Sequence, residues 1–119
     1  MKDFRQFKVW EKSHQLALAI YKATKEFPKE ELYGLTSQIR RSSMSIPTNI
    51  AEGCGRYTDA DFARFLQMAM GSASETEYQL ILARDPEFLP NNSYEQLHNE
   101  VEEVKRMLPS LLKTLRADH

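Results

Sequence analysis

The sequence predicts an all-α protein that folds as an antiparallel, up-down four-helix bundle with a proline-kinked second helix. Four segments repeat apolar residues every three or four positions, the spacing that places them on one face of an α-helix. Short connections separate these segments, so consecutive helices must reverse direction. No segment alternates apolar and polar residues as a half-buried strand does. The 119 residues suffice for one hydrophobic core, and we expect a single domain over residues 1–119.

The expected first helix, from about Phe4 to Glu26, carries two adjacent apolar stripes. A bundle interior needs an apolar stripe of roughly 100°. Two stripes exceed this width, and the excess apolar surface predicts a contact with another subunit. Phe27-Pro28 ends this helix, because the residue before a proline avoids the helical region. One stripe comprises Phe7, Trp10, His14, Ala17, Tyr21 and Thr24, and the other Val9, Leu16, Ile20, Ala23 and Phe27.

The second helix is expected to follow a short turn at residues 28–33. Pro47 removes one backbone donor and crowds the carbonyl four residues before it, so a helix that continues through this position must kink. Residue patterns alone place a break at Ile46-Pro47. Gly53 and Gly55 are expected to close the helix in left-handed conformations. The apolar residues that keep helical spacing through the segment are Leu35, Ile39, Ile46 and Ile50.

Thr58 and Asp61 form a capping-box variant that opens the third helix, and Asp85-Pro86 ends it. The inward stripe holds only small residues between Ala69 and Thr76, so the backbone of the second helix is expected to approach closely there. The whole stripe consists of Phe62, Phe65, Ala69, Ala73, Thr76, Leu80 and Ala83.

The last helix is expected to begin at a capping box made by Ser93 and Gln96. Just before it, Phe88-Leu89-Pro90 is predicted to fold back over the end of the bundle. Pro109 predicts a second kink, or a break near Arg106. An apolar seam with charged residues outside it is typical of a solvated amphipathic helix, and it comprises Leu97, Val101, Val104, Leu108, Leu111 and Leu115.

Composition and charge predict a soluble, cytoplasmic protein whose surface is not basic throughout. The formal net charge is -1, with 41% hydrophobic and 28% charged residues. Residues 1–29 nevertheless carry seven Lys or Arg against three acids, whereas residues 57–92 carry two against six. The start MKDFRQFKVW lacks the apolar core of a signal peptide, and no apolar run has the length of a membrane span. We therefore expect neither export nor membrane insertion, and the single Cys54 fits a packing residue.

No catalytic, cofactor-binding or metal-binding residues are predicted. The chain lacks a phosphate loop, a nucleophile elbow, a Cys-x-x-Cys pair and a His-Glu-x-x-His helix. The three histidines, His14, His98 and His119, show no ligand spacing. We therefore expect a protein that is not an enzyme.

A structural hydrogen-bond network is expected around Glu75. If the second and third helices are antiparallel neighbours, this carboxylate can reach Arg41, Ser45 or Asn49, and a buried carboxylate needs such donors. The network hypothesis comprises Arg41, Ser45, Pro47, Asn49, Glu52, Gly71, Ser72 and Glu75.

The run QIRRSSMSIPTNIAEG, with Gly71-Ser72 and Glu75 farther on, closely resembles the bacterial-type family of four-helix-bundle proteins encoded in 23S rRNA intervening sequences. The likeness extends from about Phe4 through the last helix. It implies one kinked helix that runs through Pro47 to about Cys54, and it implies a homopentamer. The family is similar to the accessory variability determinant of diversity-generating retroelements. The segment Asp85-Pro86-Glu87-Phe88 departs from the family's more apolar pattern, which leaves the geometry of that connection open.

Two functional classes follow from these patterns. The first is a non-enzymatic, homo-oligomeric module that associates with RNA or DNA through backbone phosphates, because flexible cations neutralise phosphates without reading bases. The alternative is a protein-protein interaction scaffold with no nucleic-acid binding, since lysines on a helix are also typical of a solvated face. The predicted nucleic-acid contacts are Lys8, Lys12, Lys22, Lys25, Arg40, Arg41 and Arg56.

Overall fold

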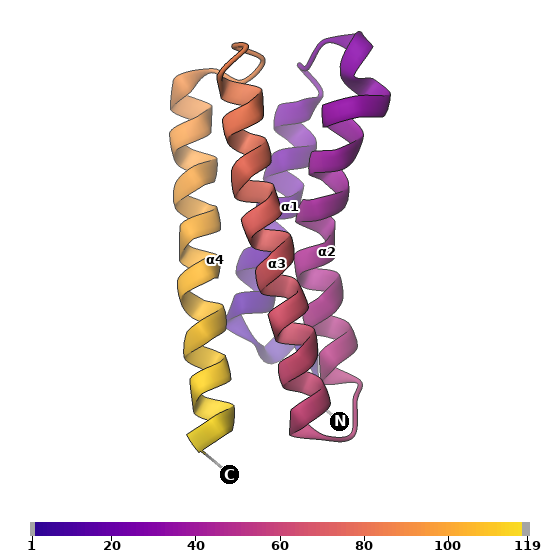
Figure 1. The fold of residues 1–119 in the computed structure, drawn as a ribbon, viewed down its shortest axis with the longest axis vertical. Helices are drawn as coiled ribbons and strands as arrows, with labels where there is room; N and C mark the ends of the chain where they lie inside the picture. Colours follow the sequence, from indigo (N-terminus) through magenta and orange to yellow (C-terminus); the bar gives the residue numbers. More distant parts are fainter. Residues whose placement is uncertain (1, 118–119) are drawn as a thin grey trace.

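Four long helices run alternately up and down in the computed structural model, which describes residues 2–117 (Figure 1). Within that range the structure contains no strand. The prediction of an all-α four-helix bundle is therefore confirmed. The helices are α1 (Lys8–Thr24), α2 (Ser37–Cys54), α3 (Asp59–Arg84) and α4 (Asn91–Ala117).

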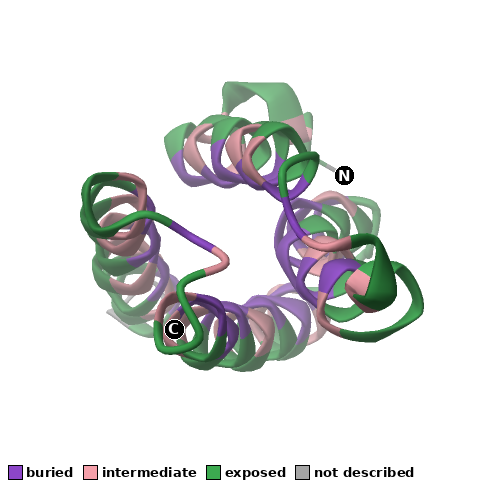
Figure 2. Ribbon diagram, turned by 90° about the horizontal axis from the view of Figure 1, so that it is seen from above, coloured by how far each residue is buried: buried purple, intermediate pink, exposed green. Residues whose placement is uncertain are grey.

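The hydrophobic core lies along the axis of the bundle, where the buried faces of all four helices meet (Figure 2). Each helix packs against its neighbours in sequence, α1 also contacts α4, and α2 and α3 make the most extensive contact. Cys54 belongs to this core at 1% exposure, as a packing residue should. The largest fully buried side chains include Leu16, Ile20, Ile39, Ile46, Ile50, Phe62, Leu66, Leu80 and Leu108.

The first helix begins later than predicted, at Lys8 and not at Phe4. A separate 3-10 turn, Phe4–Gln6, precedes it, and the Asp3 carboxylate accepts a hydrogen bond from the Arg5 amide at its start. Phe7 then adopts an extended conformation with φ -92° and ψ 121°. That residue breaks the helix while its ring packs edge-on against Phe62, with centroids 5.6 Å apart.

The connection from α1 to α2 is longer than the predicted turn. Pro28 opens a 3-10 turn, Lys29–Glu31, as expected of a proline at a new first turn. A wide turn, Leu32–Thr36, follows, and it is helical except at Gly34, which has φ -112° and ψ -115°. The α-helix itself begins only at Ser37.

Helix α2 continues through Pro47, so this proline is not a helix terminus, as the resemblance implied and against the break expected from residue patterns alone. Small polar side chains flank the proline and donate to carbonyls of their own helix. Ser45 Oγ donates to the Arg41 carbonyl, Thr48 Oγ1 to that of Met44 and Asn49 Nδ2 to that of Ser45, each at 2.9 Å. None of the three reaches the Ser43 carbonyl, which lacks its helical donor because Pro47 has no amide hydrogen; side-chain bonds of this kind instead favour a slight bend of the helix.

Gly53 and Gly55 do not adopt the predicted left-handed conformations. No glycine between residues 2 and 117 has a positive φ, and Gly55 caps α2 with φ -83° and ψ -1°. Gly53 instead allows α3 to approach, because a Cβ built there would lie 2.9 Å from both Phe62 Cδ1 and Phe65 Cβ. Real Cβ atoms almost never come that close, so this position in α2 requires glycine.

The predicted close approach of α2 and α3 is confirmed, but Gly71 is not part of it. Ala69 and Ala73 of α3 are fully buried, and so is Ser43 of α2. Gly71 is exposed, and a Cβ there would meet no atom within 4 Å. Gly53 marks a second place where α2 and α3 lie close together, beside Phe62 and Phe65 at the start of α3.

Thr58 caps α3 as predicted, because its hydroxyl accepts a hydrogen bond from the Asp61 amide at 3.1 Å. The turn after α3 also folds back over the bundle end as predicted. Leu89 is 2% exposed, and the Phe88 ring lies 6.2 Å from that of Phe27. Glu87 makes this reversal with a positive φ of 65°.

The cap predicted for α4 is wrong, because the helix begins at Asn91 and Ser93 therefore lies inside its first turn. Of the two outcomes predicted at Pro109, the break near Arg106 does not occur, since the helix continues through the proline. The kink stays a prediction. Leu108 and Leu115, on either side of the proline, are buried against the other helices, and this packing outweighs the lost hydrogen bond. Across residues 2–117, no helix offers the long apolar window that a bilayer span needs.

Candidate functional site

Arg40, one of the predicted nucleic-acid contacts, uses its guanidinium to tie α2 to the end of α1. Its Nε donates to Thr24 Oγ1 at 2.8 Å, and Nη2 donates to the Tyr21 carbonyl at 3.4 Å. The guanidinium also lies over the Tyr21 ring, 4.9 Å from its centroid. Because its donors face the end of α1, Arg40 has a structural role.

Lys12 faces the acidic side of α4. Its Nζ lies 3.5 Å from Glu103 Oε1. The neighbouring Glu100 has one carboxylate oxygen buried without a hydrogen-bond partner. Burial raises the pKa of the Glu100 carboxyl, Glu103 raises it further, and the charge of Lys12 opposes both effects. Lys12 therefore balances negative charge within the bundle.

The other predicted cations are exposed, but they do not form one patch. Lys8 lines a groove between α1 and α4 together with Arg106, which the sequence analysis did not select. Lys22 lines a second groove with Glu26 and Ser93 at the other end of α1. Arg41 lies on a third, formed by α2 and the preceding turn. The last two are Lys25 and Arg56, and the Arg56 guanidinium lies 4.7 Å from the centroid of the Phe65 ring.

An apolar groove, here termed the α1–α2 groove, runs along the outside of the first two helices. Several of its side chains are large and solvent-exposed: Leu18 is 57% exposed and Met44 is 48% exposed. Trp10 and His14 stack within it, with nearly parallel rings 5.1 Å apart. The groove is lined by Phe4, Trp10, His14, Ala17, Leu18, Tyr21, Met44, Pro47, Thr48, Ala51 and Glu52.

The outward face of α3 carries a second apolar surface, here termed the α3 outer stripe. It comprises Met68, Tyr78 and Leu82, which are 46%, 58% and 41% exposed. Their spacing keeps them on one side of the helix, and the exposed Gly71 and Glu75 fall on the same side. These three residues were not singled out from the sequence, and exposed apolar surfaces of this kind usually mark interfaces.

The polar network between α2 and α3 is centred on residues that the sequence analysis did not select. Ser42 Oγ lies 2.8 Å from Thr76 Oγ1 and donates to Gln79 Oε1, and all three side chains are buried. Gln79 Nε2 in turn donates to Glu75 Oε2 at 3.3 Å. Among the described residues, Gln79 is therefore the hydrogen-bond donor to the Glu75 carboxylate. The side chains of Ser45 and Asn49, which were predicted to reach it, donate instead to backbone carbonyls of α2.

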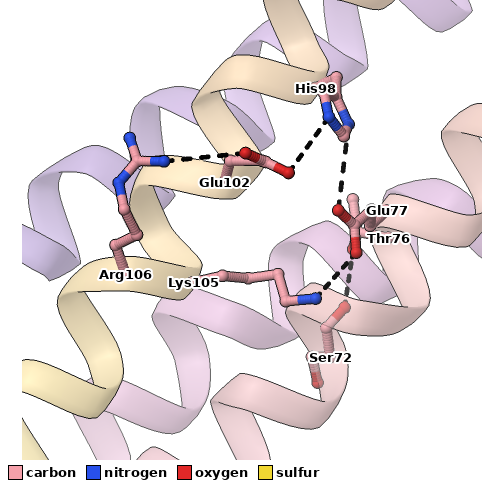
Figure 3. Close-up of polar contacts among 7 residues, drawn as sticks. All are labelled: Ser72, Thr76, Glu77, His98, Glu102, Lys105 and Arg106. Carbon is pink, nitrogen blue, oxygen red and sulfur yellow. Dashed lines mark hydrogen bonds and ion pairs between the residues drawn. The ribbon is translucent and has the colours of Figure 1, made fainter.

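A charged cluster joins α3 to α4 near the middle of the bundle (Figure 3). His98 lies between two carboxylates, with Nδ1 4.0 Å from Glu77 Oε2 and Nε2 3.3 Å from Glu102 Oε1. Lys105 Nζ lies 2.8 Å from Glu77 Oε1, and Arg106 Nη1 lies 3.8 Å from Glu102 Oε2.

This cluster was not predicted, although part of it follows a local sequence pattern. Glu102 follows His98 by four residues, the spacing that places two side chains on one helical face. Glu77 lies 21 residues before His98 on a different helix, and only the fold brings it close. His119 lies outside the described residues.

Comparisons with known proteins agree with the fold. Residues 5–110 match the model of a family described as 23S rRNA-intervening sequence protein. A crystal structure of a protein with unknown function, from the S23 ribosomal protein family of Bacteroides thetaiotaomicron, is 33% identical. The similarity covers 88% of this chain and 98% of that one, with a TM-score of 0.80. No curated protein matches the chain.

Proposed function

Because this chain belongs to the 23S rRNA-intervening sequence protein family, we propose that it is a non-enzymatic, homo-oligomeric module that associates with RNA or DNA through phosphate contacts. The family description and the similar S23-family structure both support a nucleic-acid setting. The resemblance to the accessory variability determinant of diversity-generating retroelements favours the same class of partner. A cytoplasmic location is part of this proposal.

The observation that carries the proposal is the separation of apolar and basic surfaces on α1. The α1–α2 groove contains none of the predicted cations, whereas Lys8 and Lys22 line grooves on the side of α4. Burying the α1–α2 groove in an assembly would therefore leave both lysines exposed. An exposed lysine can neutralise a phosphate, which supplies most of the affinity of sequence-tolerant nucleic-acid binding.

The assembly that we propose is a closed ring, with a pentamer as the expected size. In this arrangement the α1–α2 groove of one subunit covers the α3 outer stripe of the next, a heterologous contact that closes by rotation. The exposed apolar side chains of the two surfaces support this pairing, because each would be removed from water by the other. Such a ring would repeat each weak cation site around one axis, and multivalency would raise the overall affinity.

Salt-dependent binding tests the nucleic-acid proposal. Fluorescence anisotropy would measure binding of labelled single-stranded and double-stranded RNA and DNA at about 50 and 200 mM salt, the range over which phosphate contacts weaken strongly. We expect the wild type to bind at low salt and weaken at high salt. The double variant K8A/K22A should bind several-fold more weakly and show a smaller dependence on salt.

A matched control is the double variant K29A/K113A, which removes the same charge from exposed lysines elsewhere and should bind like the wild type. Equal losses in both double variants would show that net charge alone matters and that the α1 lysines form no site. No binding by the wild type at low salt would reject the nucleic-acid role.

That last result would favour the alternative function, a protein-protein interaction scaffold. The α1–α2 groove and the α3 outer stripe support this second candidate, because exposed apolar surfaces of this kind mark interaction sites whether or not nucleic acid binds.

A further inference from the structure

We propose that Glu77, His98 and Glu102 form a site for a divalent transition-metal ion, represented here by Zn²⁺. One ligand atom from each residue can be chosen so that all three lie within 4.8 Å of one another. Imidazole nitrogens and carboxylate oxygens are both zinc ligands, at about 2.0 to 2.2 Å. The two carboxylates and the imidazole come from two adjacent helices, so a bound ion would link α3 to α4.

The imidazole of His98 is held in place by stacking and lies between two carboxylates. Its ring stacks on Tyr94, with an interplanar angle of 16° and centroids 5.6 Å apart. The Nδ1 atom is buried and has no hydrogen-bond partner in the described part of the chain. A buried polar atom without a partner is costly, and a metal ion on the ring would let the other ring nitrogen turn toward a carboxylate.

His98 and Glu102 are already spaced like two ligands of one metal ion. Their Nε2 and Oε1 atoms are 3.3 Å apart, and two ligands of a tetrahedral zinc ion are separated by roughly 3.4 Å when each bond is about 2.1 Å. Glu77 completes the set from α3 (Figure 3). One of its oxygens lies within 4.8 Å of a ligand atom on each of the other two residues, so a change of rotamer would bring it into the coordination sphere.

Lys105 competes with a metal ion for Glu77. Its ammonium holds Glu77 Oε1 at 2.8 Å and leaves the other oxygen toward the imidazole. Arg106 lies 3.8 Å from the far oxygen of Glu102. These two cations offset the charge of the two carboxylates, which limits the affinity for a dication. Removing the charge of Lys105 should therefore strengthen metal binding, an effect opposite to that of losing a ligand.

The ligand set favours Zn²⁺ and similar ions over Mg²⁺ and Ca²⁺. Imidazole nitrogen suits zinc, copper and nickel, whereas magnesium and calcium prefer oxygen ligands alone. A site made of one imidazole and two carboxylates should thus bind Zn²⁺ in the presence of excess Mg²⁺.

Isothermal titration of the untagged, chelator-treated full chain with ZnCl₂ tests the site. We expect one ion per chain for the wild type in 1 mM MgCl₂, about tenfold or more weaker binding for H98A and for E102Q, and several-fold tighter binding for K105Q. H14A is the matched control, because His14 is an exposed histidine on another helix. It should bind like the wild type, and His119 is present in every variant, so any binding there cancels in the comparison.

Several outcomes would overturn the proposal. They are the absence of binding by the wild type at 100 µM Zn²⁺, equal binding by H98A and the wild type, or displacement of Zn²⁺ by Mg²⁺. A K105Q variant that binds no more tightly would remove Glu77 from the ligand set and with it the three-residue site. Circular dichroism would confirm that each variant folds, and E102Q changes an exposed carboxylate, so it reports on the site even if H98A unfolds.

Discussion

Two glycines in long helices show how strongly the effect of one residue depends on its surroundings. Gly53 lies where α3 approaches α2, with two phenylalanine side chains 2.9 Å from the position of a Cβ. Gly71 lies on the outward side of α3 with nothing within 4 Å. Alanine stabilises a helix interior relative to glycine by roughly 0.5 to 1 kcal/mol. Local packing therefore decides the sign of the same substitution at these two sites.

Replacing Gly71 with Ala should raise the free energy of unfolding by about 0.5 to 1 kcal/mol, because the helix gains propensity at no steric cost. Replacing Gly53 with Ala should lower it by about 1 to 3 kcal/mol, because Phe62 and Phe65 must move. Urea unfolding followed by circular dichroism would measure both, on samples whose masses match by light scattering. A stabilised G53A variant would show that α2 and α3 are not as close as the structure places them.

The roles of the adjacent residues Arg40 and Arg41 could not be distinguished from the sequence. Both are arginines in the same helix, and both were predicted to contact phosphate. The structure gives Arg40 hydrogen bonds to Thr24 and to the Tyr21 carbonyl, whereas Arg41 is exposed. The difference follows from where α1 ends beside α2, and that position depends on packing between segments that are far apart in the chain.

At the scale of elements, apolar periodicity predicts the existence and order of all four helices, and capping chemistry predicts the start of α3 at Thr58. Local rules fail where tertiary packing overrides them. Sequence rules predict a break at Pro47 and either a kink or a break at Pro109, yet both helices continue through the proline because their apolar faces remain buried on either side. The cap predicted at Ser93 fails for a related reason, since α4 already begins at Asn91.

Pro109 should therefore cost stability without shaping the fold. It is exposed within a continuous helix, and it removes the amide that would donate to the carbonyl of Lys105. Replacing it with Ala should raise the free energy of unfolding by about 1 to 2 kcal/mol: up to roughly 3 kcal/mol is recovered in the helix, while the more flexible unfolded chain offsets about 0.4 to 1 kcal/mol. Differential scanning calorimetry should show a higher Tm. An unchanged or lower Tm would mean that α4 is bent or frayed at this position.

At the scale of the whole molecule, the bundle leaves two apolar surfaces that its own core does not use. The excess apolar surface on α1 was predictable from periodicity, and the α1–α2 groove contains Trp10, His14, Ala17 and Tyr21 from one of the two stripes. The charged cluster around His98 was not predictable as a set, because Glu77 comes from α3 and joins only when α3 and α4 pack side by side. Sites shared between helices depend on the rotation of each helix about its own axis, and apolar patterns define that rotation only coarsely.

We predict that the α1–α2 groove is buried between copies of this chain. Size-exclusion chromatography with light scattering tests it most directly, on the wild type and on L18E, which places a charge in the groove at a 57% exposed position. The control is L32E, at a 47% exposed leucine outside the groove. For the wild type and L32E, light scattering should give a molar mass five times the 13.8 kDa of one chain. L18E should be a folded monomer. A monomeric wild type across micromolar concentrations, or an L18E variant that keeps the full assembled mass, would contradict the claim.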